Sequence, residues 1–297
     1  MQISIKSFLS EDPVRPGKET VLRIEKIDRA GKTRVTSKQD EVATEEPLEI
    51  RVLTQTSGSA WTKNSIAVTM RTPGNDFELA SGFLFSEGVV KDHDDIVQIS
   101  YCTDETETQR YNIVNVYLSQ NVRFDPSKLS RHTYTSSSCG ICGKGSIEQV
   151  RALCDTKPLG DFKVSPELLL SLPDKLKQAQ NVFERTGGLH ASALFRATGD
   201  LNMIREDVGR HNALDKVVGS LFMHRELPSS NAILLLSGRA SFELVQKAAL
   251  AGIPFVCAVG APSSLAVDLA RDYEMSLVGF LRGESLNVYS GSERIKS

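Results

Sequence analysis

The chain has 297 residues, of which 40% are hydrophobic and 24% are charged, with a formal net charge of −2. These values suit a globular protein with a large core or two domains, and they exclude a nucleic-acid binder that depends on a strong basic excess. No apolar run approaches the ~18 residues of a membrane span. The N-terminal residues show no signal-peptide core, so we expect a cytoplasmic location.

Residues 1–45 are predicted to form an N-terminal extension. The segment Val21–Ile24 is a strand candidate, whereas the polar run from Gly31 to Glu46 is interpreted as a loop. The segment Glu45-Glu46-Pro47 is interpreted as a hinge into the folded part of the chain.

Residues 46–135 are predicted to form a small mixed β-rich domain. Alternation of apolar and polar residues predicts a strand around residues 48–52, and further strands are expected at 66–70, 96–101 and 111–118. A helix is expected to begin after the turn Arg71–Gly74, with Asn75 or Asp76 as its cap, and to end at Gly88.

Residues 136–297 are predicted to form an α/β domain with a Cys-x-x-Cys loop at its start. Cys139 and Cys142 are surrounded by serines and glycines, and a helical pattern begins with Ile147. Helix N-termini stabilise negative charge, and Lys144 adds a positive charge, so this position favours a reactive thiolate.

The paired thiols suit several kinds of site. They could form a redox dithiol, half of a zinc site, a pair that only packs, or a carrier that holds sulfur as a persulfide. Zinc would need two more ligands, yet Cys102, Cys154 and Cys257 stand alone. Cys154 and Cys257 lie in apolar patterns and are expected in the core.

The middle of the chain is predicted to alternate helix and hairpin. Ser165 is expected to cap a helix that Pro173 interrupts, followed by a second helical segment to about Phe183. Strands at 191–195 and 201–204 form a predicted hairpin. The next helix is expected to be capped by His211 or Asn212.

The last third predicts a parallel, two-sided sheet. Apolar strands at 232–236, 254–259 and 276–281 alternate with helices at 242–251 and 263–273, the second capped by Ser263 or Ser264. In such sheets the ligand crevice lies beyond the carboxyl ends of the strands.

Small and basic residues gather at these predicted strand ends. Gly238 and Arg239 follow one strand, Gly260–Ser264 follows the next, and Arg282 and Glu284 follow the third. Neighbouring helix N-termini of this kind can cradle a phosphate, although ordinary capping explains the same residues. The mixed charges at 205–212 likewise suit either an anion site or a solvated turn.

Several stretches together resemble the formate dehydrogenase accessory sulfurtransferases, the FdhD/NarQ family. The resemblance extends from Glu46 to Asn287 and leaves the first 40 residues outside. Its motifs are Arg71-Thr72-Pro73-Gly74, Ser81-Gly82-Phe83-Leu84, Cys139-Gly140-Ile141-Cys142-Gly143, Arg185-Thr186-Gly187-Gly188-Leu189-His190, Glu206-Asp207-Val208-Gly209-Arg210-His211-Asn212-Ala213 and Leu236-Ser237-Gly238-Arg239.

The resemblance implies a cytoplasmic sulfurtransferase and a particular fold. The fold would be a cytidine-deaminase-like three-layer α/β/α domain with the smaller mixed β-rich domain at its N-terminal side. Cys139 would carry the persulfide with Cys142 as its partner. Sulfur would come from a cysteine desulfurase and pass to the molybdenum (or tungsten) bis-guanine-dinucleotide cofactor before that cofactor enters formate dehydrogenase.

The resemblance also implies where the cofactor is bound. Its cofactor-binding segment corresponds to Phe280, Leu281, Arg282, Gly283, Glu284 and Ser285, beside Gly238 and Arg239 of the predicted cradle. A homodimer is expected, without a permanent metal, nucleic acid or membrane partner. The alternative is a chaperone that binds the molybdenum cofactor without transferring sulfur.

Overall fold

The computed structural model describes residues 17–28, 34–55, 60–104, 107, 110–126 and 157–296. The Cys139/Cys142 loop, Lys144 and the helix expected around Ile147 lie outside these described residues, as do His132 and Cys154. The other predicted site residues, Gly238, Arg239 and Phe280–Ser285, lie within the described residues.

The larger sheet has six strands in the order β12-β11-β10-β9-β7-β8. Strands β9, β10 and β11 run parallel, whereas β7, β8 and β12 pair antiparallel. The parallel centre and the hairpin of the sequence analysis are therefore confirmed, and β12 is an addition. The bounds are β7 His190–Arg196, β8 Leu201–Asp207, β9 Ala232–Leu236, β10 Phe255–Ala258, β11 Ser276–Arg282 and β12 Ser285–Ser290.

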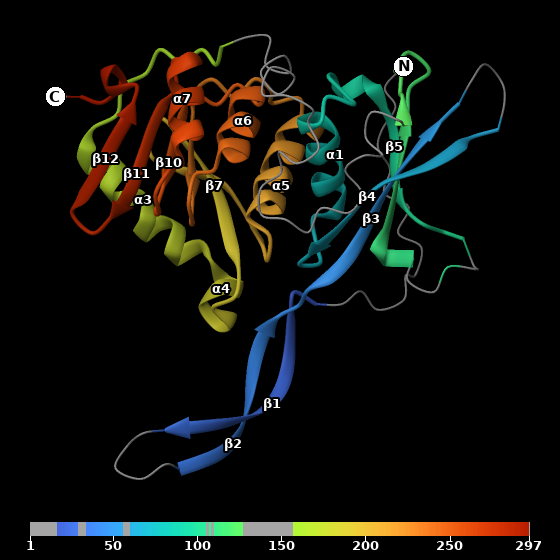
Figure 1. The fold of residues 1–297 in the computed structure, drawn as a ribbon, viewed down its shortest axis with the longest axis horizontal. Coiled ribbons are helices and arrows are strands. Elements are labelled where there is room, and N and C mark those ends of the chain that lie inside the picture. Colours follow the sequence, from blue (N-terminus) through green and yellow to red (C-terminus); the bar gives the residue numbers. More distant parts are fainter. Residues whose placement is uncertain are drawn as a thin grey trace.

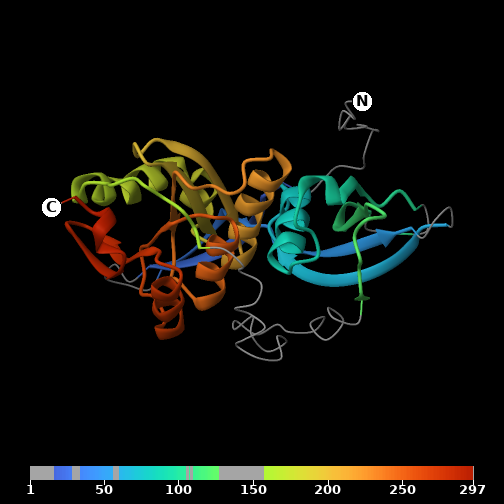
Figure 2. The same cartoon turned by 90° about the horizontal axis from the view of Figure 1, so that it is seen from above.

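Helices cover both faces of this sheet (Figures 1 and 2). In β9, Leu234 and Leu236 face a core built with α5, α6 and α7, while Ile233 and Leu235 face a second core built with α3. A strand buried on both faces must be apolar at every position, which explains its unbroken apolar sequence. The helices are α3 Pro166–Ala179, α4 Asn181–Thr186, α5 Arg210–Met223, α6 Phe242–Leu250 and α7 Ser264–Asp272.

A four-stranded sheet with the order β4-β3-β6-β5 forms the neighbouring part of the molecule. The inward residues Leu48, Ile50 and Val52 of β3 pack with Leu79 and Leu84 of α1 in a third core. All four predicted strands are confirmed. The bounds are β3 Glu46–Thr54, β4 Thr62–Arg71, α1 Asp76–Ser86, β5 Ile96–Tyr101 and β6 Ile113–Leu118, with 3-10 turns at His93–Asp95, Arg110–Asn112 and Ser292–Arg294.

Helices α1 and α5 join the two sheets by backbone contact (Figure 1). A Cβ on Gly82 would lie 1.9 Å from the carbonyl oxygen of Asp215, and a Cβ on Gly219 would lie 1.8 Å from that of Glu78. Only glycine permits helices to approach this closely.

The prediction of a loop from Gly31 to Glu46 is wrong. Residues Arg34–Ala43 form strand β2, which pairs antiparallel with β1 Glu19–Asp28 as a long hairpin (Figure 1). At the base of this hairpin, Arg185 of α4 forms ion pairs with Glu19 of β1 and Glu41 of β2. Cross-strand pairing rather than apolar alternation makes β2, so the polar sequence concealed it.

Two further expectations required correction. Helix α3 continues through Pro173, because Leu169, Leu172 and Leu176 on one side of it are buried against the sheet, and such packing can outweigh the ~3 kcal/mol cost of an internal proline. Helix α5 begins at Arg210 with Gly209 as its N-cap, two residues before the start that a His211 cap would give.

The caps predicted at Ser165 and Ser263 are confirmed, since their hydroxyls accept hydrogen bonds from the backbone N–H groups of Leu168 and Ala266. Cys257 is fully buried in β10, as expected. Within the described residues, no helix is long and apolar enough to cross a membrane.

Candidate functional site

The three loops at the carboxyl ends of β9, β10 and β11 lie side by side. The backbone N–H of Gly260 donates to the carbonyl of Gly238 at 2.9 Å, and the N–H of Phe280 donates to the carbonyl of Gly260 at 3.0 Å. Ala240 and Pro262 form a further bridge between the first two loops. The structure thus brings together the residues that sequence patterns placed at separate strand ends.

Glycine is needed where these loops meet. A Cβ on Gly260 would lie 3.1 Å from both the Gly238 oxygen and Cγ of Arg239, and a Cβ on Gly279 would lie 2.7 Å from Cδ of Pro262. Because these two glycines have no side chain, the loops can pack against each other. The N-termini of α6 and α7 therefore lie next to each other at this edge. Such an arrangement favours an anionic ligand.

The segment from Phe280 to Ser285 bends at a β-bulge. Phe280 has a φ of +52°, and the Arg282 guanidinium carbon lies 5.7 Å from the centre of its ring. The side chain of Leu281 is fully buried in the α3 core, so this residue can offer a ligand only its backbone. Gly283 and Glu284 form an exposed turn between β11 and β12.

Two histidines border the Gly238 loop. A Cβ on Gly238 would lie 3.4 Å from Nδ1 of His190. Nε2 of His211, in the first turn of α5, lies 3.5 Å from the Ser241 hydroxyl and 3.4 Å from a Glu243 oxygen. Sequence patterns placed Arg210 and His211 in the candidate anion site at residues 205–212. They did not indicate Ser241 and Glu243, which carry no signal in the sequence beyond their place at a helix start.

The surroundings of both imidazoles favour their neutral form. Burial lowers the pKa of His190, and the Arg210 charge lowers it further. Burial also lowers the pKa of His211 to about 4, although Glu243 opposes this effect. The edge therefore offers two neutral proton acceptors beside Arg210 and Arg239.

Asp207 holds the start of α5 in place. One of its oxygens lies 2.7 Å from Nζ of Lys216 and accepts from the N–H of Thr72 at 3.2 Å. The other accepts from the N–H of Gly209 and from the Asn212 amide, at 2.8 and 3.1 Å. The carboxylate is fully buried, so this segment is a structural clamp between the two sheets rather than a solvated turn.

The clamp explains why the predicted cap was wrong. The Asn212 amide also donates to the carbonyl of Met70 at 2.8 Å, and its oxygen accepts from the Thr69 hydroxyl at 3.2 Å. Asn212 therefore connects α5 to β4 instead of capping its own helix.

A second buried ion pair leads away from the site. Nζ of Lys247 lies 2.7 Å from a carboxylate oxygen of Asp215 and 3.7 Å from one of Glu243. Asp215 also accepts a hydrogen bond from the Ser86 hydroxyl of α1 at 3.1 Å. Burial raises the pKa of Asp215 to about 6, although Lys247 opposes it. Burial lowers the pKa of Lys247, but Asp215 and Glu243 outweigh this and raise it overall. His211 is thus linked through Glu243 and Lys247 to the α1 contact.

Among the residues that the structure describes, no group of three or more His, Cys, Asp or Glu side chains is arranged to hold a metal ion. The described chemistry of this edge is that of glycine loops, helix N-termini, arginines and neutral histidines.

These features define an α/β protein in which three strand–loop junctions and the starts of two helices meet at one edge of the large sheet. The sequence model of the FdhD/NarQ family matches residues 43–296, and the chain belongs to this family. Proteins named sulfur carrier protein FdhD are similar over most of the chain. That of Streptomyces coelicolor is 50% identical over 277 residues, covering 91% of this chain and 94% of its own. That of Mycobacterium tuberculosis is 48% identical over 267 residues, covering 88% and 94%.

A crystal structure is also similar. It is that of a proposed formate dehydrogenase accessory protein from Desulfotalea psychrophila, with a TM-score of 0.70 and 26% identity, covering 94% of this chain and 99% of that one. The mixed α/β fold described above is therefore similar to the fold of this accessory protein.

Proposed function

We propose that this protein is a sulfur carrier in the maturation of formate dehydrogenase. The observation that carries the proposal is the identity of about half of all residues, over nine-tenths of the chain, with proteins named as sulfur carriers. The sequence supplies the thiols that such a role requires, at Cys139 and Cys142.

The proposed reaction is a persulfide transfer. The Cys139 thiolate attacks the terminal sulfur of a persulfide on a cysteine desulfurase, forming Cys139–S–S⁻ and leaving the donor as a thiol. Cys142 then attacks the inner sulfur of the protonated persulfide, forming a disulfide and releasing HS⁻ to the acceptor. This protein is then a persulfide-forming sulfurtransferase.

The proposed acceptor is the molybdenum bis-guanine-dinucleotide cofactor, bound as a substrate at the carboxyl edge. Its diphosphates would approach the adjacent N-termini of α6 and α7, beside Arg239. Phe280, Arg282 and the turn residues Gly283–Ser285 would contact the nucleotide, with Leu281 anchoring that segment in the core. The glycine loops and arginines of the edge support a polyanionic ligand.

Other parts of the proposal concern organisation and location. A boundary near residue 136 separates the β-rich part from a cytidine-deaminase-like α/β/α domain, residues 1–45 form an extension, and the protein is a cytoplasmic homodimer. Light scattering after gel filtration tests the dimer, since a monomeric mass at micromolar concentration contradicts it.

Substitution of Cys139 tests sulfur transfer. In cells that lack the native protein, Cys139→Ala should abolish formate dehydrogenase activity. The control Cys102→Ser, at the residue that follows β5, should restore it. Full activity with Cys139→Ala removes the persulfide role.

Mass spectrometry separates the carrier from a chaperone that only binds the cofactor. After incubation with a cysteine desulfurase and L-cysteine, the peptide that contains Cys139 should gain the mass of one sulfur atom. An unmodified peptide in an activating protein supports the chaperone instead.

A further inference from the structure

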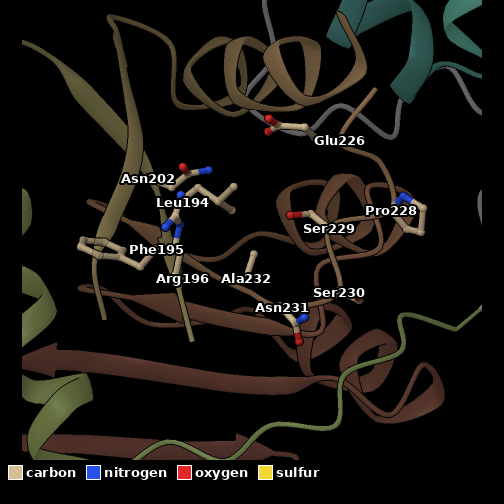
Figure 3. A pocket seen from close by; sticks show the side chains of 10 residues that line it. All are labelled: Leu194, Phe195, Arg196, Asn202, Glu226, Pro228, Ser229, Ser230, Asn231 and Ala232. Atoms are coloured by element: carbon tan, nitrogen blue, oxygen red, sulfur yellow. The ribbon is translucent and has the colours of Figure 1, made fainter. Parts of the chain in front are cut away.

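A hollow of about 260 Å³ opens at the end of the large sheet opposite the proposed cofactor edge (Figure 3). It lies where β9 begins at Ala232, whereas the Gly238 loop follows the other end of that strand. The segments around it are the end of β7, the start of β8 and the loop between α5 and β9. This hollow is therefore separate from the site described above.

The hollow presents two opposite charges that are not paired with each other. Arg196 of β7 and Glu226 of the α5–β9 loop both line it. In the described part of the chain, neither side chain forms a hydrogen bond or an ion pair within 4.0 Å. A guanidinium and a carboxylate that share a hollow without meeting leave room for a ligand that contacts both.

Neutral polar groups lie beside these charges and line the same hollow. Figure 3 shows Arg196 and Asn202 on one side and Ser229 on the other, with the Glu226 carboxylate directed between them. The loop is held to the sheet by backbone bonds from Ala197 to Asn231 and from Ser229 to Ala251, at 3.1 and 2.9 Å. The hollow is thus built on fixed backbone rather than on a free loop.

The charges select the chemical class of the ligand. A simple anion would be repelled by Glu226, and a simple cation would be repelled by Arg196, because like charges nearby are unfavourable. A molecule with both charges satisfies both groups. The volume of about 260 Å³ lies below the ~300–1,000 Å³ of pockets for drug-sized ligands, so the molecule is small.

We propose that this hollow binds a small zwitterion of the free α-amino-acid class, with its carboxylate on Arg196 and its ammonium on Glu226. The amides of Asn202 and Asn231 and the Ser229 hydroxyl complete the polar contacts. The proposal is independent of the sulfur-carrier function.

Nuclear magnetic resonance on the full chain tests the proposal, with L-alanine as the probe. The backbone amide signals of Arg196, Ser229 and Asn231 should shift saturably in the millimolar range. N-acetyl-L-alanine, which lacks the ammonium, and L-alaninamide, which lacks the carboxylate, should not shift them. The proposal is overturned if L-alanine causes no saturable shift or if either derivative binds equally well.

Substitutions identify the two charged contacts. Arg196→Gln and Glu226→Gln should each weaken L-alanine binding by about tenfold or more, since each removes a charge-assisted hydrogen bond. Arg271→Gln, on the exposed surface of α7, is the matched control and should bind normally. Unchanged affinity in both pocket variants, with melting temperatures equal to that of the native chain, contradicts the assignment.

Discussion

The contact between α1 and α5 predicts a large effect of adding one methyl group at Gly82. In Gly82→Ala, the new Cβ would lie 1.9 Å from the Asp215 carbonyl oxygen and 2.8 Å from both the Asp215 carbonyl carbon and the Gly219 nitrogen. All of these are backbone atoms, so no side-chain rotation relieves the overlap. The helices must move apart by more than about 1 Å, because carbon and oxygen atoms normally approach to ~3.3 Å.

Two effects of opposite sign determine the magnitude. Alanine is favoured over glycine within a helix by about 1 kcal/mol. Overpacking costs about 1–3 kcal/mol and occasionally more, and separation of the helices also lengthens the buried 3.1 Å bond from Ser86 to Asp215, which is worth about 1 kcal/mol. We therefore expect a net loss of about 1–3 kcal/mol from a total near 5–15 kcal/mol.

Urea denaturation followed by circular dichroism measures this loss. Gly188→Ala is the control, because a Cβ there meets Cβ of Ala43 at 3.4 Å and the Thr186 carbonyl oxygen at 3.9 Å, both ordinary contacts. The double variant Gly82→Ala/Gly219→Ala should lose less than the sum of the single variants, since both insert a methyl group into one contact. A Gly82→Ala protein as stable as the native chain refutes the backbone contact.

Three other predictions follow from the buried groups. Asp207→Asn should reduce the free energy of unfolding by about 3–5 kcal/mol, because it leaves Lys216 charged and buried without its carboxylate; a smaller loss in Asp207→Asn than in Lys216→Met/Asp207→Leu contradicts the clamp. The pKa of His211 is lowered to about 4 in the folded protein, so the stability that its neutral form contributes is complete above pH 6.5 and is lost as the pH falls toward 4. In parallel urea titrations, His211→Gln should therefore lose less stability than the native chain over this pH window. An identical dependence of stability on pH in the two proteins contradicts the role of His211. Leu281→Ala should cost about 2–5 kcal/mol of stability, because it leaves a cavity in the core. Arg282→Ala should leave stability unchanged and weaken the binding of a guanine nucleotide, measured by calorimetry. A stable Leu281→Ala protein together with a destabilised Arg282→Ala protein that binds normally contradicts the proposal that Leu281 anchors this segment and Arg282 contacts the nucleotide.

Features that depend on neighbours along the chain were predictable. The strand Ala232–Leu236 was recognised because burial on both faces demands apolar residues at every position, and Ser165 and Ser263 were recognised because a cap acts within one helical turn. The loops after β9, β10 and β11 were placed at one edge because parallel strands share the direction of their ends. These inferences need only local periodicity and one rule of sheet topology.

Features that depend on distant partners were missed or misassigned. The polar strand β2 exists because β1 pairs with it, and α3 continues through Pro173 because its leucines are buried against the sheet. Asn212 binds Asp207 and the carbonyl of Met70 rather than its own helix end. In each case a contact between segments outweighs the local preference of the residue.

The sequence by itself thus determined the order of the elements, the apolar centre of the large sheet and the residues at its carboxyl edge, because periodicity and capping act over a few residues. Only the tertiary structure decided that His190 lies beside Gly238, that Gly82 meets Gly219, and that Arg196 and Glu226 share a hollow. Such neighbours are far apart in the chain, and no local pattern encodes which distant backbone a side chain will face.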